Sequence, residues 1–374
     1  MRIVSVDIFP MSLPMRQSFQ IAAGSVGDRA TGAPHVYVRV VTEEGFTGWG
    51  EARPSHRWSY ETIETVVSTI RNYLAPAILG CRIDNLEGVH QAMDGVIANG
   101  PQIGQPIAKS AIDMAIHDAA ARACHRPLSF LWSRPKPIDA ALSYLISSRD
   151  PREVEAKAQA AISQGFTGID VKIGFGLETD LAILEAIETV GQQVFLRVDA
   201  NQGYQLSDAR VVGNYLARIG ANVFEQPLKA HDLHGHATLR SVIDVPIALD
   251  ESILSPRDVM TAARVEACDA IVVKVTKMGG LGRAKLSGEI AHELGLDLLG
   301  GGLTESTLGL SAGALLFDAI GITHPVDLNG PFFLQDDPVV NKGNLEGGVI
   351  QLPIGDGLGC DISLTKLEEF TVST

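Results

Sequence analysis

Five charged residues recur at nearly even intervals through the middle of the chain. Lys172, Asp199, Glu225, Asp250 and Lys274 are separated by 27, 26, 25 and 24 residues. Each closes a short apolar segment, and each interval is close to the length of one βα unit. In a (β/α)-barrel the carboxyl ends of the strands meet at one mouth, where barrel enzymes place their chemistry. The spacing therefore predicts that two lysines and three carboxylates point into one cavity.

Three carboxylates in one pocket repel one another unless a cation neutralises them. A ligand set made of oxygens selects a hard cation, so we expect Mg²⁺, with Mn²⁺ as the alternative. The sequence has no His/Cys cluster with zinc spacing. His231, His234 and His236 lie in a predicted loop, and we expect them to be solvated.

The elements that must position these residues follow a regular pattern from about residue 138 onward. Apolar, β-rich segments alternate with amphipathic stretches, which is typical of a (β/α)-barrel. We expect eight strands, at 140–146, 168–173, 194–199, 222–225, 246–250, 270–275, 297–299 and 324–328. The fold class is therefore α/β, a modified TIM barrel.

The residues before the barrel read differently. Predicted strands at about 3–14, 36–42 and 46–51 are followed by helical patterns at about 60–75, 85–97 and 107–124, which indicates an α+β domain. We predict a capping domain over 1–130 and a catalytic barrel over 131–349. The tail, 350–374, is too short to be a domain and should pack back on the capping domain.

Composition limits the function classes. The formal net charge of −14 disfavours nucleic-acid and anionic-membrane partners, because phosphates would be repelled. No apolar run reaches membrane-spanning length, no signal peptide is visible, and the four cysteines are scattered. We expect a cytoplasmic enzyme.

Several motifs together resemble a known family. The segments 196–204 (LRVDANQGY), 224–228 (FEQPL), 248–252 (ALDES) and 269–281 (DAIVVKVTKMGGL) are similar to the metal-ligand and base strands of the mandelate racemase/muconate-lactonizing group of the enolase superfamily. The segment 108–118 (AKSAIDMAIHD) and the tail motif PIGDGLG extend the resemblance over nearly the whole chain, closest to the muconate-lactonizing branch.

The resemblance implies roles for individual residues. Asp199, Glu225 and Asp250 would bind Mg²⁺, and Lys172 and Lys274 would face each other across the substrate. Cap loops at about 19–24 and 54–60 would cover the barrel mouth and choose the substrate. Other polar residues of these motifs are expected to bind substrate or to support the site: Asn201, Glu251, Glu305, Asp327 and Asn329.

The chemistry of such a site is removal of the proton next to a substrate carboxylate. A metal bound to the carboxylate oxygens stabilises the resulting enediolate, and a neutral lysine can take the proton. Lys274 follows the apolar run Ile271–Val273, so we expect partial desolvation to lower its pKa and to make it an essential base. Lys277 should tolerate substitution better, although it could share the electrostatic environment of Lys274.

One position departs from the family pattern. The muconate-lactonizing branch usually carries Lys-x-Lys on the second barrel strand, whereas this chain has Asp170-Val171-Lys172. Residues two apart on a strand share a face, so Asp170 could stabilise the ammonium form of Lys172 and make it an acid or a fixed cation. Alternatively, Asp170 points toward a neighbouring strand and leaves Lys172 an ordinary base.

These residues leave several functions open. The leading hypothesis is an isomerase acting on a small-molecule carboxylate: a racemase or epimerase of an amino-acid-like acid, or a muconate-type cycloisomerase. Some family members bind the ammonium group of their substrate with an Asp-x-Asp motif. This chain has Asp327-Leu328-Asn329 at that place, which weakens the hypothesis of an amino-acid-like substrate. A dehydratase, a Schiff-base aldolase using Lys274 and a non-catalytic binding protein are the alternatives. We expect a homo-oligomer.

Overall fold

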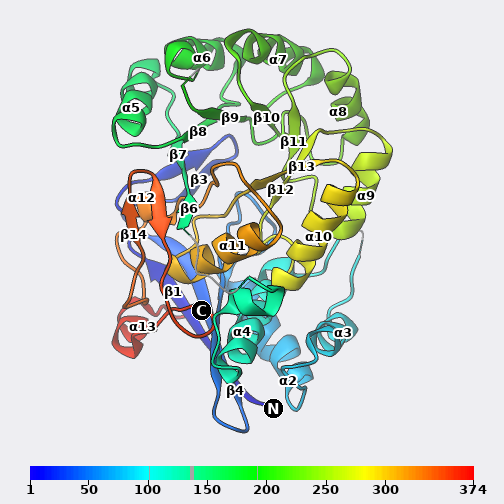
Figure 1. Cartoon of the computed structure of the whole chain (residues 1–374), viewed down its shortest axis with the longest axis vertical. Coiled ribbons are helices and arrows are strands. Elements are labelled where there is room, and N and C mark those ends of the chain that lie inside the picture. Colours follow the sequence, from blue (N-terminus) through cyan, green and yellow to red (C-terminus); the bar gives the residue numbers. More distant parts are fainter. Residues whose placement is uncertain (101, 135–138, 192) are drawn as a thin grey trace.

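The computed structural model describes residues 1–100, 102–134, 139–191 and 193–374. The polypeptide forms a parallel barrel with an antiparallel sheet and helices below it (Figure 1). The barrel helices form the outer arc in the upper part of that view. The prediction of a (β/α)-barrel with an α+β cap is confirmed.

The capping sheet has the strand order β1-β4-β5. Its strands are β1 (Ile3–Leu13), β4 (Ala33–Thr42) and β5 (Thr47–Ala52), and the hairpin β2 (Phe19–Ile21) and β3 (Gly24–Gly27) leads toward the barrel. The cap helices are α1 (Ile63–Thr69), the π-helical turn η1 (Ile70–Leu74), α2 (Ala75–Ile78), α3 (Leu86–Val96), α4 (Pro106–Ala123) and the 3₁₀ turn η2 (Leu128–Trp132). The short hairpin was not predicted.

Helix α4 packs directly on β5 because two glycines allow it. A Cβ at Gly48 would lie 2.0 Å from the carbonyl oxygen of Ala115, and one at Gly50 would lie 2.0 Å from that of Ala111. Any larger residue would push the helix off the sheet. This close approach buries α4 in the middle of the molecule, between the cap sheet and the barrel helix α10.

Among the described residues, the barrel sheet contains seven parallel strands in sequence order. They are β7 (Ser143–Ile146), β8 (Gly168–Lys172), β9 (Phe195–Asp199), β10 (Val223–Glu225), β11 (Ile247–Leu249), β12 (Ala270–Val273) and β13 (Asp297–Gly300). The predicted eighth strand is reduced to two parallel bridges, Leu142–Val326 and Gly301–Asp327. Those two bridges still connect β13 to the first strand, so the eighth segment closes the ring.

Helices connect the strands and cover the outside of the barrel (Figure 1). They are α5 (Pro151–Ser163), α6 (Leu177–Gly191), α7 (Leu206–Ile219), α8 (Leu233–Arg240), α9 (Pro256–Arg264), α10 (Leu281–Glu293), α11 (Thr307–Ala319) and the short α12 (Gly330–Phe333). His236 lies within α8, is fully buried and accepts a hydrogen bond from the Leu228 N–H. The expectation of a solvated His236 is therefore wrong.

The last segments return to both parts of the molecule. Strand β14 (Asn344–Glu346) pairs with β15 (Val349–Gln351), which pairs in turn with β6 (Asp139–Ala141). The tail then forms α13 (Leu364–Phe370), after which the Val372 N–H donates to the Pro10 carbonyl. The domain limits at 130 and 350 stay predictions.

A buried carboxylate joins the cap to the barrel. Glu51 on β5 accepts hydrogen bonds from the backbone N–H groups of Ser306 (2.9 Å) and Gly309 (2.8 Å) at the start of α11. A helix N-terminus leaves such donors unsatisfied within the helix, and the Glu51 carboxyl oxygens accept from two of them. The contact fixes the cap over the carboxyl ends of the barrel strands.

In the described part of the chain we find no helix with the length and apolar character needed to span a membrane.

Candidate active site

The five evenly spaced residues lie at one end of the barrel. Lys172, Asp199 and Glu225 are the last residues of their strands, and Asp250 and Lys274 follow the last residues of theirs. The three carboxylates are fully buried, and the two lysines are 4% exposed. Both lysines line one small cavity beneath the cap.

The ammonium group of Lys172 is surrounded by carboxylates. Its Nζ lies 2.7 Å from Asp199, 3.2 Å from Asp170 and 3.7 Å from Asp327. Burial alone would lower the pKa of Lys172. The charges of these three carboxylates raise it by more, so the net pKa lies well above the usual value. Lys172 is a fixed cation in this structure.

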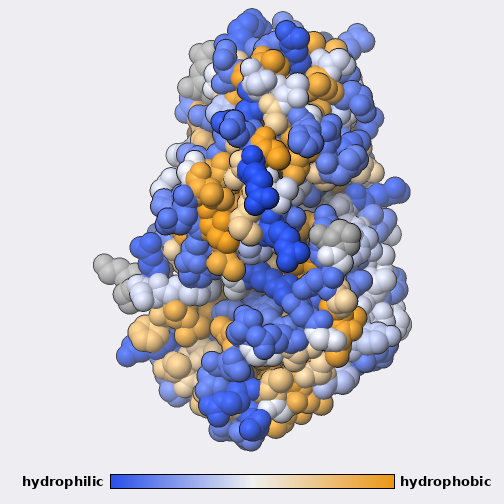
Figure 2. Space-filling view, turned by 90° about the vertical axis from the view of Figure 1, so that its right-hand side faces the viewer, coloured by the Kyte–Doolittle hydropathy of each residue, from blue (hydrophilic) through white to orange (hydrophobic). Residues whose placement is uncertain are grey.

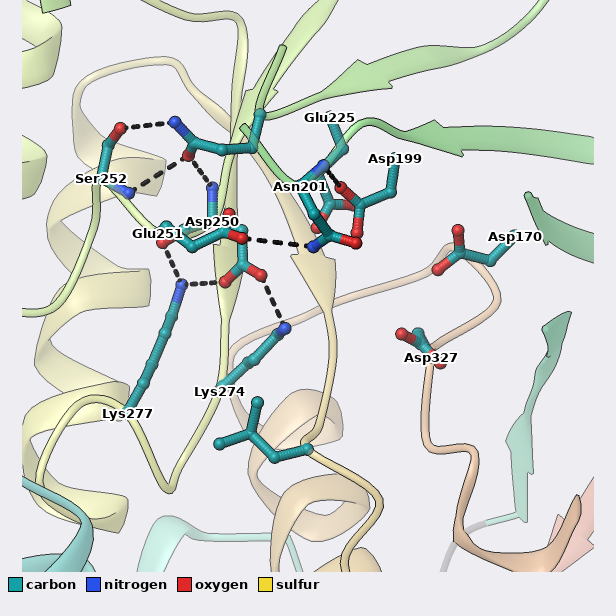
Figure 3. Close-up of polar contacts among 12 residues, drawn as sticks. Asp170, Asp199, Asn201, Glu225, Asp250, Glu251, Ser252, Lys274, Lys277 and Asp327 are labelled. Atoms are coloured by element: carbon teal, nitrogen blue, oxygen red, sulfur yellow. Dashed lines mark hydrogen bonds and ion pairs between the residues drawn. The ribbon is translucent and has the colours of Figure 1, made fainter. Parts of the chain in front are cut away.

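Lys274 is held mainly by one carboxylate. Its Nζ lies 2.6 Å from an oxygen of Asp250, a contact drawn in Figure 3. It also lies 5.2 Å from the centre of the Trp58 ring. Burial lowers the pKa of Lys274, as expected, but the negative charges of Asp250 and Glu225 raise it by more. The expectation of a lowered pKa is therefore not met in this structure.

Asp170 faces Lys172 and also the next strand. Asp170 pairs with Arg197 in the register of β8 and β9, and its Oδ2 lies 3.6 Å from the Arg197 Nε. Asp170 therefore contacts Lys172, as one interpretation of the sequence expected, and also a residue of the neighbouring strand, as the other expected. The other Asp170 oxygen is buried and has no partner among the described residues.

Arg197 and Lys277 also belong to this cluster. Sequence reasoning assigned no role to Arg197, and for Lys277 it suggested only that the residue could share the electrostatic environment of Lys274. Arg197 is completely buried, forms an ion pair with Glu225 and donates to the Gly300 carbonyl. It lies two residues before Asp199 and so shares its face, a signal that the sequence contained. Lys277 is also completely buried, and its Nζ lies 2.7 Å from both the side chain and the carbonyl oxygen of Asp250.

The turns after the strands hold the carboxylates in place. Gln226, directly after Glu225, adopts a left-handed backbone conformation (φ 36°), and its side-chain oxygen accepts from the N–H groups of Asp250 and Ser252 (Figure 3). Such conformations are costly and are found at functional sites. Here the strained turn at Gln226 holds the backbone of Asp250, the third of the three carboxylates, in place.

The remaining predicted site residues divide into two groups. Asn201, Asp327 and Asn329 line the cavity, and the Asn329 amide donates to Asp327 (3.0 Å). Glu251 accepts a hydrogen bond from Asn201 (3.2 Å), whereas Glu305 accepts from Thr276 (2.9 Å). Glu251 and Glu305 are buried but do not line the cavity.

The donor set fits a hard cation. Burial and the charges of Asp199 and Asp250 raise the pKa of Glu225, so negative charge is crowded here. Glu225 Oε1, Glu251 Oε2 and Asn201 Oδ1 are buried oxygens without a partner among the described residues. Within the described ranges, however, no three His, Cys, Asp or Glu side chains form a ready metal-binding group. The lysine ammonium groups occupy oxygens of Asp199 and Asp250 instead.

The cavity itself is small and mostly apolar. Its volume is 30 Å³, and the cap contributes Phe19, Ile21, Val26, Ser55 and Trp58 to its walls. Typical ligand pockets hold about 300 Å³ or more. A substrate of ordinary size therefore needs more room than the cavity has in this structure.

Comparison with known proteins agrees with this architecture. Residues 3–132 match the model of the mandelate racemase/muconate lactonizing enzyme N-terminal domain, and residues 153–366 match that of the enolase C-terminal domain-like family. The chain is 30% identical to the N-succinyl-L-Arg/Lys racemase of Bacillus cereus, over 100% of this chain and 98% of that protein.

Solved structures give the same result. The crystal structure of 2-chloromuconate cycloisomerase from Rhodococcus opacus has a TM-score of 0.93 at 27% identity and covers 100% of both chains. The dipeptide epimerase from Enterococcus faecalis, complexed with Mg and the dipeptide L-Leu-L-Tyr, has a TM-score of 0.89 at 29% identity and covers 96% of this chain and 100% of that one. The chain therefore belongs to the mandelate racemase/muconate lactonizing enzyme family of the enolase superfamily and is an isomerase of that group.

Proposed function

We propose that the protein is a Mg²⁺-dependent racemase or epimerase that moves the α-proton of an N-substituted amino acid, such as an N-acylamino acid or a dipeptide. The observation that carries the proposal is that Lys172 and Lys274 line the same cavity, next to three buried carboxylates. The similarity to a racemase of N-succinylated amino acids and to a dipeptide epimerase supports this substrate class.

Asp199, Glu225 and Asp250 would hold the metal, with Mn²⁺ as an alternative ion. When bound, the ion supplies positive charge that stabilises the enediolate formed as the α-proton leaves. In the structure Lys172 and Lys274 contact two of these carboxylates. We infer that each lysine moves from its carboxylate toward the substrate when the site is loaded.

The two lysines would then have unequal surroundings. Lys172 keeps Asp170 and Asp327 as neighbours, at 3.2 and 3.7 Å, even without Asp199. Lys274 has Asp250 as its only ion-pair partner among the described residues, so after release it keeps no carboxylate within ion-pair distance. The Trp58 ring, 5.2 Å away, is a weaker partner for an ammonium group than a carboxylate. An ammonium beside carboxylates holds its proton, whereas a desolvated amine loses it more easily. For one enantiomer we assign Lys274 as the base that removes the α-proton and Lys172 as the acid that delivers a proton from the other side. Because racemisation is reversible, the two roles exchange for the other enantiomer.

The cavity walls favour an apolar substituent on the substrate. Phe19, Ile21 and Trp58 cover the site from the cap side. Asp327 is already paired with Lys172 and accepts from Asn329, so it is a poor partner for a substrate ammonium group. A neutral acylated nitrogen beside an apolar side chain suits these groups better than a free amine.

The test is a screen of N-acylamino acids, dipeptides and free amino acids in D₂O with Mg²⁺, followed by NMR. We expect Mg²⁺-dependent exchange of the α-proton, with inversion, in an N-acylated or dipeptide substrate with an apolar side chain. Exchange in free amino acids but in no acylated compound would contradict the substrate assignment, and no exchange in any carboxylic acid would contradict the reaction.

The unequal lysines also suit a second candidate, a cycloisomerase of a muconate-like dicarboxylic acid. Such a reaction delivers a proton to only one face of the intermediate. It needs one lysine as the acid and no second lysine as a base on the opposite face. Incubation with cis,cis-muconate distinguishes the two functions, because loss of diene absorbance without α-proton exchange in amino-acid derivatives would favour cycloisomerisation. Homo-oligomer formation and a cytoplasmic location stay predictions.

A further inference from the structure

A second and larger cavity lies where the cap meets the outside of the barrel. Its volume is 510 Å³, and its walls come from α3 and α4 of the cap and α9 and α10 of the barrel. None of the five strand-end residues lines it. A cavity of this size is large enough for a small organic ligand.

One end of this cavity is rich in hydrogen-bond donors. Helix α10 begins here at Leu281, whose N–H donates to the buried carboxylate of Asp113. The next two N–H groups, of Gly282 and Arg283, have no acceptor among the described residues. Free N–H groups in the first turn of a helix attract anions.

A buried histidine points to a ligand at the same place. His117 is only 2% exposed, and its Nδ1 lies 2.8 Å from the carbonyl oxygen of Asp113. Its Nε2 forms no hydrogen bond or ion pair with the described residues and is not fully enclosed, and the ring lines the cavity. His90 binds Asp113 through Nε2 (2.6 Å), and its buried Nδ1 is also without a described partner.

The charge state of His117 suits an anion. Burial lowers the pKa of His117, but the adjacent Asp113 carboxylate raises it by more, so the net pKa is above the usual value. A protonated ring donates through both nitrogens. The Nε2–H group would then face the cavity as a charged donor.

The acidic groups around the cavity are neutralised or solvated. Asp94 forms ion pairs with Lys109 and Arg283. Asp113, the carboxylate nearest the donor end, is paired with His90 and His117. Glu87 is on the exposed surface of α3, and Arg257 at the rim is exposed and forms no ion pair within the described ranges. An anion in the cavity would therefore not meet an unpaired buried carboxylate.

The opposite walls are apolar. Leu86 and Ile103 come from the cap side, and Met260 and Leu286 come from α9 and α10. Met260 is 44% and Leu286 48% exposed, which is high for large apolar side chains. Figure 2 faces the side of the molecule on which α9 lies, where hydrophobic and hydrophilic residues are mixed. A ligand with an apolar body would cover these side chains.

We propose that this cavity binds a small organic acid with one carboxylate and an apolar body, such as an aromatic monocarboxylate. The carboxylate would receive hydrogen bonds from the Gly282 and Arg283 N–H groups and from His117, and the apolar body would lie against Met260 and Leu286. The site joins α4 of the cap to α10, which follows Lys274 by seven residues. This inference is independent of the proposed substrate of the barrel.

Benzoate is a suitable probe, and benzamide, of the same shape but neutral, is its control. We expect calorimetry on the full chain to give a benzoate Kd of about 1 mM or tighter and binding of benzamide at least about tenfold weaker. In ¹⁵N NMR of the imidazole rings, benzoate should shift the Nε2 resonance of His117. Equal binding of both compounds, or no saturable binding of benzoate, would overturn the proposal.

Three variants locate the site. A Cβ at Gly282 would lie 3.8 to 3.9 Å from Asp113, His117 and His90, so Gly282→Leu fills the donor end without removing a donor. Gly95→Leu is the matched control, because no atom lies within 4 Å of a Cβ there. Lys274→Ala changes the barrel cavity.

We expect Gly282→Leu to weaken benzoate binding by about tenfold or more, with Gly95→Leu and Lys274→Ala unchanged. Binding that survives in Gly282→Leu but is lost in Lys274→Ala would place benzoate in the barrel and refute the second site. If Gly282→Leu does not fold, the His117 Nε2 resonance of the unaltered protein decides: an unshifted resonance at saturation refutes the proposal.

Discussion

Lys277→Met isolates the role of a buried lysine in supporting Asp250. Lys277 is completely buried, and its Nζ donates to the Asp250 carboxylate and to the Asp250 carbonyl oxygen, both at 2.7 Å. Methionine fills nearly the same volume but donates no hydrogen bond. The substitution therefore removes two charge-assisted bonds without opening a large cavity.

The magnitude follows from those two bonds. A hydrogen bond to a charged group contributes about 1.5–3 kcal/mol, and breaking a buried ion pair costs about 3–5 kcal/mol. Lys274 still holds the other Asp250 oxygen at 2.6 Å, so we expect the lower end, about 3 kcal/mol of unfolding free energy. Because Asp250 is a proposed metal ligand that Lys277 both orients and partly neutralises, the substitution should change the Mg²⁺ affinity by about 10- to 100-fold.

Urea denaturation and Mg²⁺ titration of the activity measure these two effects. Lys285→Met is the matched control, since Lys285 pairs with Glu289 on the surface of α10 and should contribute less than about 1 kcal/mol. Wild-type stability and Mg²⁺ affinity in Lys277→Met would refute the support role and restore the simpler expectation that Lys277 tolerates substitution.

Three further outcomes are expected. Asp199→Asn, or EDTA treatment, should abolish turnover while circular dichroism shows a folded barrel; full activity without metal would contradict the ligand assignment. Asp170→Asn removes a carboxylate 3.2 Å from Lys172, so the limb of the pH–rate profile that reports Lys172 should move to lower pH by about one unit; an unchanged profile would contradict their coupling. Burial raises the pKa of Glu51 from 4.5 to about 8, so its contribution to stability is present below pH 4.5 and is lost as the pH rises through 8. Glu51→Gln should reduce this loss by about 2–3 kcal/mol between about pH 6 and pH 9 in urea titrations; parallel pH profiles of the two proteins would contradict it.

The positions of the strand-end residues could be predicted from the sequence because all strands of a parallel barrel end at the same mouth. Carboxyl ends of successive strands converge, so an even spacing of Lys172, Asp199, Glu225 and Asp250 predicts one cavity without knowledge of any contact. Arg197 could have been predicted in the same way, because it lies two residues before Asp199 and therefore on the same face of the strand. The reduced eighth strand still closes the barrel, because two bridges are enough to join Val326 and Asp327 to the neighbouring strands.

The ion pairs that Lys172 and Lys274 form with carboxylates could not be predicted from the sequence. Lys172 reaches Asp199 because the β8–β9 register sets these residues opposite each other, and a register is not visible in one chain. The raised pKa of Lys274 depends likewise on its contact with Asp250 across strands. The cap residues that cover the site, such as Trp58, depend on how two separately patterned parts of the chain dock.

The central claim, that Lys274 removes the α-proton and Lys172 returns it, is tested most directly by deuterium exchange in single enantiomers. Each enantiomer of a substrate found in the screen is incubated in D₂O with Mg²⁺ and Lys172→Ala or Lys274→Ala. We predict that Lys172→Ala still exchanges the α-proton of the enantiomer that faces Lys274, without inversion, and that Lys274→Ala does not exchange that enantiomer. Wild-type exchange of that enantiomer by Lys274→Ala would contradict the account.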